Sequence, residues 1–181
     1  AVVVNRASSN SVALGNLYRE RRQLPPQNLV RIDWSGSRVE WTRAQCQATL
    51  VDPLNTELAR RGLAGQIDYV VLSMDIPYRV TEGAAFNSTT AVLFYGFKTN
   101  GVPRPTGCHL SPVSGSGYYL SELALRPRPG VTNTPVYLAT MLTGASLADA
   151  AAVLERGVLS DGAPWTAPVL LIPLVLSLMI I

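Results

Sequence analysis

The sequence has almost no lysine and only one histidine, and these absences limit what the chain can bind. Lys98 is the single lysine among 15 basic residues, so the other 14 are arginine. The arginines are scattered over 181 residues without a dense stripe, and the net charge is only +3. A nucleic-acid-binding domain concentrates its basic residues on one face. We therefore expect no nucleic-acid partner.

Cysteine is also scarce, which limits metal sites and nucleophiles. Cys46 and Cys108 have no C-x-x-C spacing, and two cysteines are too few for a disulfide scaffold. The pair forms either one bridge or two unrelated thiols. The single histidine, His109, directly follows Cys108, and neighbouring side chains in an extended loop point to opposite sides. The sequence therefore predicts no catalytic residue and no metal site.

Glycine-rich phosphate-binding motifs are missing as well. Neither G-x-G-x-x-G nor G-x-x-x-x-G-K followed by serine or threonine occurs, although the chain contains 14 glycines. These motifs supply the backbone N–H groups that hold a nucleotide's phosphates. We therefore predict no cofactor.

What the sequence does contain is an alternation of apolar strands with capped helices. We predict strands near residues 1–5, 29–34, 67–74 and 136–141, each of them largely apolar. Thr42 and Gln45 form a capping box for one intervening helix, and Pro53 restarts or kinks that helix. Uniformly apolar strands are typical of a parallel sheet covered on both faces. The predicted fold class is α/β, with a mostly parallel sheet of at least four strands and helices on both faces.

One long segment between the third and fourth predicted strands does not fit this repeat. Its second half, residues 98–135, is rich in proline and glycine. Loops of this length inside a compact domain are usually functional or ordered by a partner. We therefore predict a single α/β domain over residues 1–162, with residues 98–135 as a loop insertion.

Residues 163–181 form an apolar tail without a charged side chain. A membrane-spanning helix needs about 20 apolar residues, and the dense part of the tail, residues 169–181, is shorter. Proline in a soluble helix costs about 3 kcal/mol, but membrane helices tolerate it better. The tail is therefore expected to enter a membrane or to be buried in a partner subunit. The contacting residues would be Trp165, Val169, Leu170, Leu171, Ile172, Leu174, Leu176 and Met179.

A candidate ligand site follows from the predicted sheet. In open α/β sheets, ligands bind outside the carboxyl ends of the strands, where the strand order reverses. Polar residues that follow the first and third strands, or precede a later helix, would line such a cleft. They are Asn5, Arg6, Asp75, Arg79, Asn87, Ser88 and Thr89. Structural roles remain open for some of them, namely an ion pair between Asp75 and Arg79, and capping of a helix over residues 91–97.

Four segments together resemble a known family in their order and spacing. They are VVVNRASSNSVALGNLYRERRQLPPQNLVRI, YVVLSMDIPYRV, FNSTTAVLFYGF and YLATMLTGASLADAAAVLERGVLSDG. The likeness is to uncharacterised, exported bacterial proteins of the kind common in acidobacterial genomes, and it covers residues 1–162. Family members continue for another half-domain where this chain has its apolar tail. The resemblance implies export but names no reaction, substrate or cofactor.

The order of predicted elements also resembles gingipain-type cysteine peptidases, in layout alone. Such enzymes bring a histidine and a cysteine together from loops after later strands, which His109 beside Cys108 does not provide. The chain begins on an apolar run without a leader, so it is either processed, which would mean export, or trimmed.

Two functions therefore remain open. One is a non-catalytic, exported accessory or structural subunit, attached to a membrane or to a larger membrane-associated assembly. The alternative is a hydrolase-like or small-ligand-binding α/β domain that uses the strand-end cleft. The first is favoured because the attachment features are stronger than the catalytic ones. We then expect a periplasmic or extracellular location, with the membrane or neighbouring subunits as partners.

Overall fold

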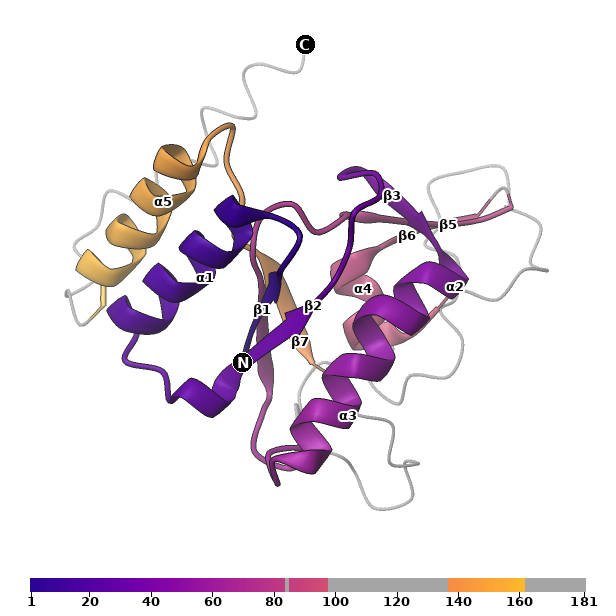
Figure 1. Ribbon diagram of the computed structural model, residues 1–181, viewed down its shortest axis with the longest axis horizontal. Coiled ribbons are helices and arrows are strands. Elements are labelled where there is room, and N and C mark those ends of the chain that lie inside the picture. Colours follow the sequence, from indigo (N-terminus) through magenta and orange to yellow (C-terminus); the bar gives the residue numbers. More distant parts are fainter. Residues whose placement is uncertain (84, 98–136, 162–181) are drawn as a thin grey trace, which may run out of the picture.

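The centre of the molecule is a four-stranded parallel sheet (Figure 1). The computed structural model describes residues 1–83, 85–97 and 137–161, so the predicted loop and tail lie outside the described residues. The strands are β1 (Val2–Asn5), β2 (Leu29–Ile32), β4 (Tyr69–Leu72) and β7 (Leu138–Met141). They lie in the order β2-β1-β4-β7, and all three neighbouring pairs are parallel. The predicted α/β fold with a mostly parallel sheet is confirmed.

Helices cover both faces of this sheet, as predicted. One face carries α1 (Ser9–Arg21) and α5 (Leu147–Leu159), and the other carries α2 (Arg43–Cys46), α3 (Asp52–Arg60) and α4 (Thr89–Tyr95). Because side chains alternate along a strand, Val3 packs among the residues of the α3 face, whereas Val2 and Val4 pack near Tyr18 of α1. Among the described helices, none is long and apolar enough to cross a membrane.

Local sequence explains where the helices begin. Ser8 and Ser146 cap α1 and α5 through their side chains, and Thr42 with Gln45 forms the predicted capping box. The helix that starts at α2 continues through a π-helical turn, η2 (Gln47–Val51), into α3. Proline has no N–H to donate, and Pro53 lies at the start of α3 just after this π-helical turn, where the hydrogen-bonding pattern of the continuous helix changes.

A second, smaller sheet was not predicted. It contains β3 (Glu40–Thr42), β5 (Arg79–Glu82) and β6 (Ala85–Ser88), with β3 and β5 parallel and β5 and β6 antiparallel. Trp41 and Val80 are buried in the core, whereas the strands also carry the Arg79–Glu40 ion pair at 2.6 Å. These strands are short and two of them carry charged side chains, so they lack the apolar run by which a strand is predicted from sequence. They form because they pair with segments distant in the sequence.

The position of α5 bears on what can follow it. The chain passes from β1 to β2 through α1 on one face, and returns across the sheet to β4 and β7 through helices on the other face. These connections share one hand, as nearly all parallel crossovers do. Helix α5 follows β7 but packs on the face of α1, where Ala150 meets Leu14 and Arg21 pairs with Glu155 at 2.6 Å. A strand placed beyond β7 directly after α5 would need the opposite hand.

Candidate functional site

The loops after β1, β2 and β4 meet at the carboxyl end of the sheet, and Asn5 joins them. Its amide nitrogen donates to the carbonyls of Trp34 at 2.8 Å and Asp75 at 3.1 Å. Its side-chain oxygen accepts from the backbone N–H groups of Trp34 at 2.9 Å and Ala7 at 3.2 Å. An asparagine side chain offers two donors and two acceptor positions, so all four are engaged. Asn5 is 2% exposed and therefore acts as a clamp between loops.

Asp75 lies beside this clamp with an unusual backbone conformation. Its φ of 61° is in the left-handed region, which costs a non-glycine residue about 1 kcal/mol. Its carboxylate accepts a hydrogen bond from the Ser8 hydroxyl at 2.5 Å and lies 3.5 Å from the guanidinium of Arg38. The ion pair with Arg79 that the sequence left open is not formed, because Arg79 pairs with Glu40 instead. The Asp75 side chain is only 10% exposed.

The remaining predicted residues belong to the second sheet and to the start of α4. Ser88 accepts from a backbone N–H in the first turn of α4, which confirms the capping role. Thr89 is fully buried, donates to the Pro77 carbonyl at 2.6 Å and accepts from the Trp41 indole at 3.2 Å. Asn87 is buried on β6. These side chains stabilise the second sheet, and the structure does not bring them to the Asn5 clamp.

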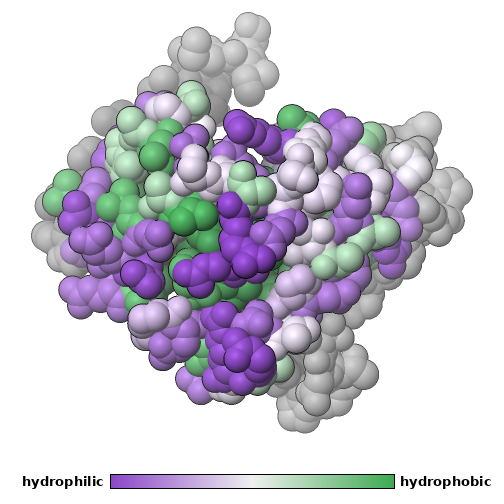
Figure 2. All heavy atoms as spheres, viewed as in Figure 1, coloured by the Kyte–Doolittle hydropathy of each residue, from purple (hydrophilic) through white to green (hydrophobic). Residues whose placement is uncertain are grey.

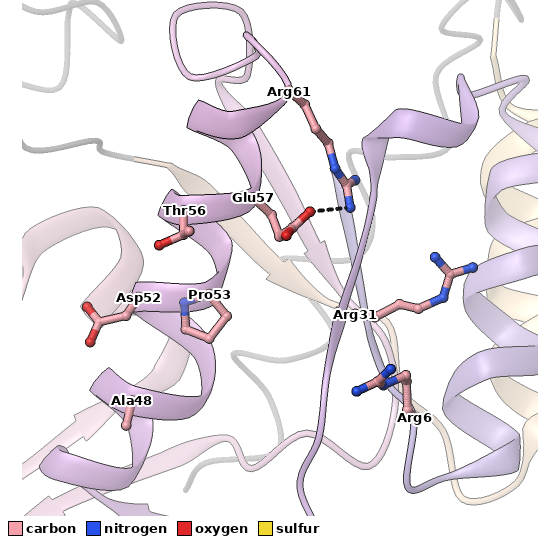
Figure 3. A pocket seen from close by; sticks show the side chains of 8 residues that line it. All are labelled: Arg6, Arg31, Ala48, Asp52, Pro53, Thr56, Glu57 and Arg61. Carbon is pink, nitrogen blue, oxygen red and sulfur yellow. Dashed lines mark ion pairs between the residues drawn. The ribbon is translucent and has the colours of Figure 1, made fainter.

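The described surface is hollowed elsewhere, between β2 and α3 (Figure 3). This β2–α3 groove has a volume of about 570 Å³. Its arginines come from three segments: Arg6 follows β1, Arg31 belongs to β2 and Arg61 follows α3. Figure 2 shows strongly hydrophilic residues gathered at the centre of the face where β2 lies. The lining consists of Arg6, Arg31, Ala48, Asp52, Pro53, Thr56, Glu57 and Arg61.

Two of the three arginines are held by carboxylates. Arg6 donates from Nε to Asp33 at 2.8 Å and makes a second contact with the same carboxylate. This hydrogen bond lowers the pKa of Asp33 and raises the pKa of Arg6. Arg61 lies 2.7 Å from Glu57, whose pKa is lowered first by the hydrogen bond from Arg60 and also by Arg61. The bound carboxylates offset most of the positive charge of the groove.

Arg31 is the exception. Within the described ranges its guanidinium has no hydrogen-bond or ion-pair partner, and the residue is exposed. Arg61, by contrast, donates to the backbone carbonyls of Gln27 at 2.6 Å and Leu29 at 2.8 Å. Arg61 therefore holds the start of β2 in place, while Arg31 remains free to meet a binding partner.

The described residues offer little for covalent or metal chemistry. Cys46 is a free, buried thiol, and burial raises its pKa to about 12, so it stays protonated near neutral pH. No group of three or more histidine, cysteine, aspartate or glutamate side chains in the described part of the chain is placed to hold a metal ion. Cys108 and His109 lie outside the described residues.

The sequence did not predict the residues that complete the Asn5 clamp and the β2–α3 groove. Ser8 and Arg38 contact Asp75, yet neither residue belongs to a sequence motif that points to a site. Arg31 and Arg61 were single members of a scattered arginine set. One feature of the sequence could have indicated Arg31. It is a charged residue inside an otherwise apolar strand, and such a residue is typical of an exposed edge strand.

Known proteins do not add a function to this geometry. No protein-family model, curated protein or solved structure matches the chain. The resemblance to exported bacterial proteins and the gingipain-like layout therefore stay predictions. The function has to be argued from the residues themselves.

Proposed function

We propose that this chain is a non-catalytic accessory or structural subunit, exported and attached to a membrane or to a larger membrane-associated assembly. The main support for the proposal is that the polar side chains at the carboxyl end of the sheet form hydrogen bonds with the protein itself. Asn5 has no hydrogen-bonding capacity left, and Ser8 both caps α1 and donates to Asp75. A ligand cleft at a strand-order reversal needs such groups free to meet the ligand. A clamp that joins loops suits a rigid scaffold better.

The apolar tail supplies the attachment in this proposal. Burial of apolar surface is worth about 25 cal/mol per Å², so a tail of residues 163–181 left in water would be strongly unfavourable. The packing of α5 on the face of α1 disfavours one intramolecular alternative, since a strand added beyond β7 directly after α5 would have the rare hand. Both arguments support placing the tail in lipid or in a neighbouring subunit.

The alternative, a hydrolase-like or small-ligand-binding domain, rests on a single feature. Asp75 combines a strained backbone with a mostly buried carboxylate, and strained residues cluster at functional sites. Its two contacts, Ser8 and Arg38, also provide a structural reason for the same conformation. We therefore favour the subunit.

Deletion of the tail tests the proposal. The intact chain and a chain lacking residues 163–181 are expressed in the same host, and the membrane and soluble fractions are compared with and without detergent. We expect the intact chain to leave the membrane fraction only with detergent, and the shortened chain to be soluble and folded by circular dichroism. A same-length variant, with Leu170, Leu171, Leu174 and Leu176 changed to serine, separates apolarity from length and should also be soluble. An intact chain that is soluble without detergent, together with an unfolded shortened chain, would place the tail in the chain's own core and refute the proposal.

A further inference from the structure

Strand β2 lies at an edge of the main sheet, and part of its outer side is available for pairing. Ile32 faces β1, because its carbonyl accepts from the Arg6 N–H at 2.8 Å. Backbone groups of successive residues alternate in direction along a strand, so Leu29 and Arg31 present theirs outward. Arg61 already covers the Leu29 carbonyl. In the part of the molecule that is described, the N–H and C=O of Arg31 remain open to another strand.

The two walls of the β2–α3 groove carry opposite charges that are not neutralised. Arg31 stands on the strand side without a partner, whereas Arg6 on the same side is paired with Asp33. Figure 3 shows the Arg31 guanidinium pointing away from α3 and the Asp52 carboxylate pointing away from β2, so the two unpaired charges lie at opposite rims of the groove. Asp52 belongs to α3 and accepts from the Gln47 amide, but no cation among the described residues pairs with it. Glu57 is already occupied by Arg61. A complementary partner would present an acid to Arg31 and a base to Asp52.

The character of the groove suits a peptide better than a small molecule. Small-molecule pockets are mostly apolar and enclose most of the ligand, whereas five of the eight lining residues here are charged. An extended peptide that adds to a sheet edge gains affinity from main-chain hydrogen bonds and specificity from alternate side chains. Both features are present at Arg31, where an open backbone edge and an unpaired guanidinium coincide.

We propose that the β2–α3 groove docks an extended, mixed-charge segment of a partner protein. The segment pairs with the outer edge of β2 at Arg31, places an acidic side chain on the Arg31 guanidinium and directs a basic side chain toward Asp52. This inference rests on the proposed function, because it names the partner contact of a structural subunit. Arg61 limits the docked strand to the part of β2 that starts at Arg31.

Peptide binding tests the inference on the intact 181-residue chain in detergent. The probes are fluorescein-labelled octapeptides of alternating valine and threonine with one glutamate and one lysine, at spacings varied across the panel. Fluorescence anisotropy should show saturable binding for at least one spacing, and Arg31→Glu should raise its Kd about tenfold or more, because repulsion replaces a charged hydrogen bond. Replacing the glutamate of that peptide by lysine should restore binding to Arg31→Glu. N-methylation of the peptide backbone should abolish binding to the unaltered chain.

Controls separate this site from general charge and from misfolding. Arg156→Glu removes an exposed arginine on α5, in the opposite helix layer, and should leave the Kd within about twofold. Arg31→Gln should weaken binding without reversing the preferred peptide charge, and circular dichroism checks the fold of each variant. Absence of binding across the panel, or equal loss in Arg156→Glu, overturns the inference. Membrane fractionation of Arg31→Glu measures membrane attachment independently of peptide binding. A failure of the peptide-binding inference can therefore be distinguished from a failure of the proposed function.

Discussion

Asn5 is a polar residue at the end of a central strand, and its role is to hold the neighbouring loops together. Its four hydrogen bonds connect the turn after β1 to the loops after β2 and β4. These loops lie at the place where an α/β sheet usually binds a ligand. Asp75 and Ser8 extend the same connection, so the position of each strand end depends on the others. A substitution at one of these residues should therefore lower the free energy of unfolding of the whole domain.

Asn5→Ala is expected to lower the free energy of unfolding by about 3 kcal/mol. The substitution leaves the half-buried N–H of Trp34 and two half-buried carbonyls without their partner, and each unsatisfied group costs about 1 kcal/mol at this burial. Urea unfolding followed by circular dichroism measures the change. Asn16→Ala, at an exposed position of α1, is the matched control and should change stability by less than about 0.5 kcal/mol. Equal effects of the two substitutions would show that the clamp does not stabilise the fold.

At the scale of elements, the contact between α1 and β1 depends on a glycine. A Cβ built on Gly15 would lie 2.0 Å from a methyl carbon of Val4, so no larger residue fits without movement of the helix or the strand. The close approach lets Val4 and Leu29 pack directly beneath the helix. This packing fixes the helix layer that α5 later joins.

Gly15→Ala should therefore destabilise the protein by about 1–3 kcal/mol, in spite of the better helix propensity of alanine. Val4→Ala in the same chain should recover part of this loss, because it removes the methyl groups in conflict. The control is Gly65→Ala, since an added Cβ there meets no atom within 4 Å. Urea midpoints of the two single variants and of the double variant measure the effect. Strict additivity of the Gly15 and Val4 changes would contradict a direct clash.

The elements that the sequence predicted are those with local causes. Strands β1, β2, β4 and β7 are short apolar runs, and the capping box at Thr42 is a side-chain to backbone contact within three residues. The second sheet and the β2–α3 groove depend on distant pairings, such as Arg79 with Glu40 and Arg61 with the Leu29 carbonyl. No residue pattern specifies those partners. The seven predicted site residues are accordingly divided between the strand-end loops, the second sheet and the groove.

At the scale of the whole molecule, the helix layer of α2, α3 and α4 holds the larger core. This core buries Cys46, Leu50 and Leu54 against the sheet, and Tyr137 donates from its hydroxyl to Asn55 of α3 at 3.0 Å. Two ionisable groups are thus kept neutral inside the largest apolar cluster. Burial raises the pKa of Cys46 to about 12 and the pKa of Tyr137 to about 12.

These buried groups predict a loss of stability at alkaline pH. Both folded pKa values exceed the ordinary values of 9.0 for a cysteine thiol such as Cys46 and 10.0 for a tyrosine hydroxyl such as Tyr137, so the folded state keeps protons that the unfolded state releases. Their stabilising contribution is complete below about pH 9 and is lost as the pH rises toward 12. The urea midpoint should therefore fall steeply as the pH rises above 9.

Cys46→Ala separates the thiol from the other alkaline titrations. Alanine cannot ionise, so the fall of the midpoint between pH 9 and 11 should become shallower, although the variant is less stable at pH 7 because a small cavity is left. Iodoacetamide gives an independent readout: at pH 8 the peptide that contains Cys46 should stay unlabelled in the folded chain and become labelled in guanidinium chloride. Labelling of Cys46 in the folded chain at a rate near that of a free thiol would show that the thiol is accessible and ionised. The alkaline transition would then have to come from other groups.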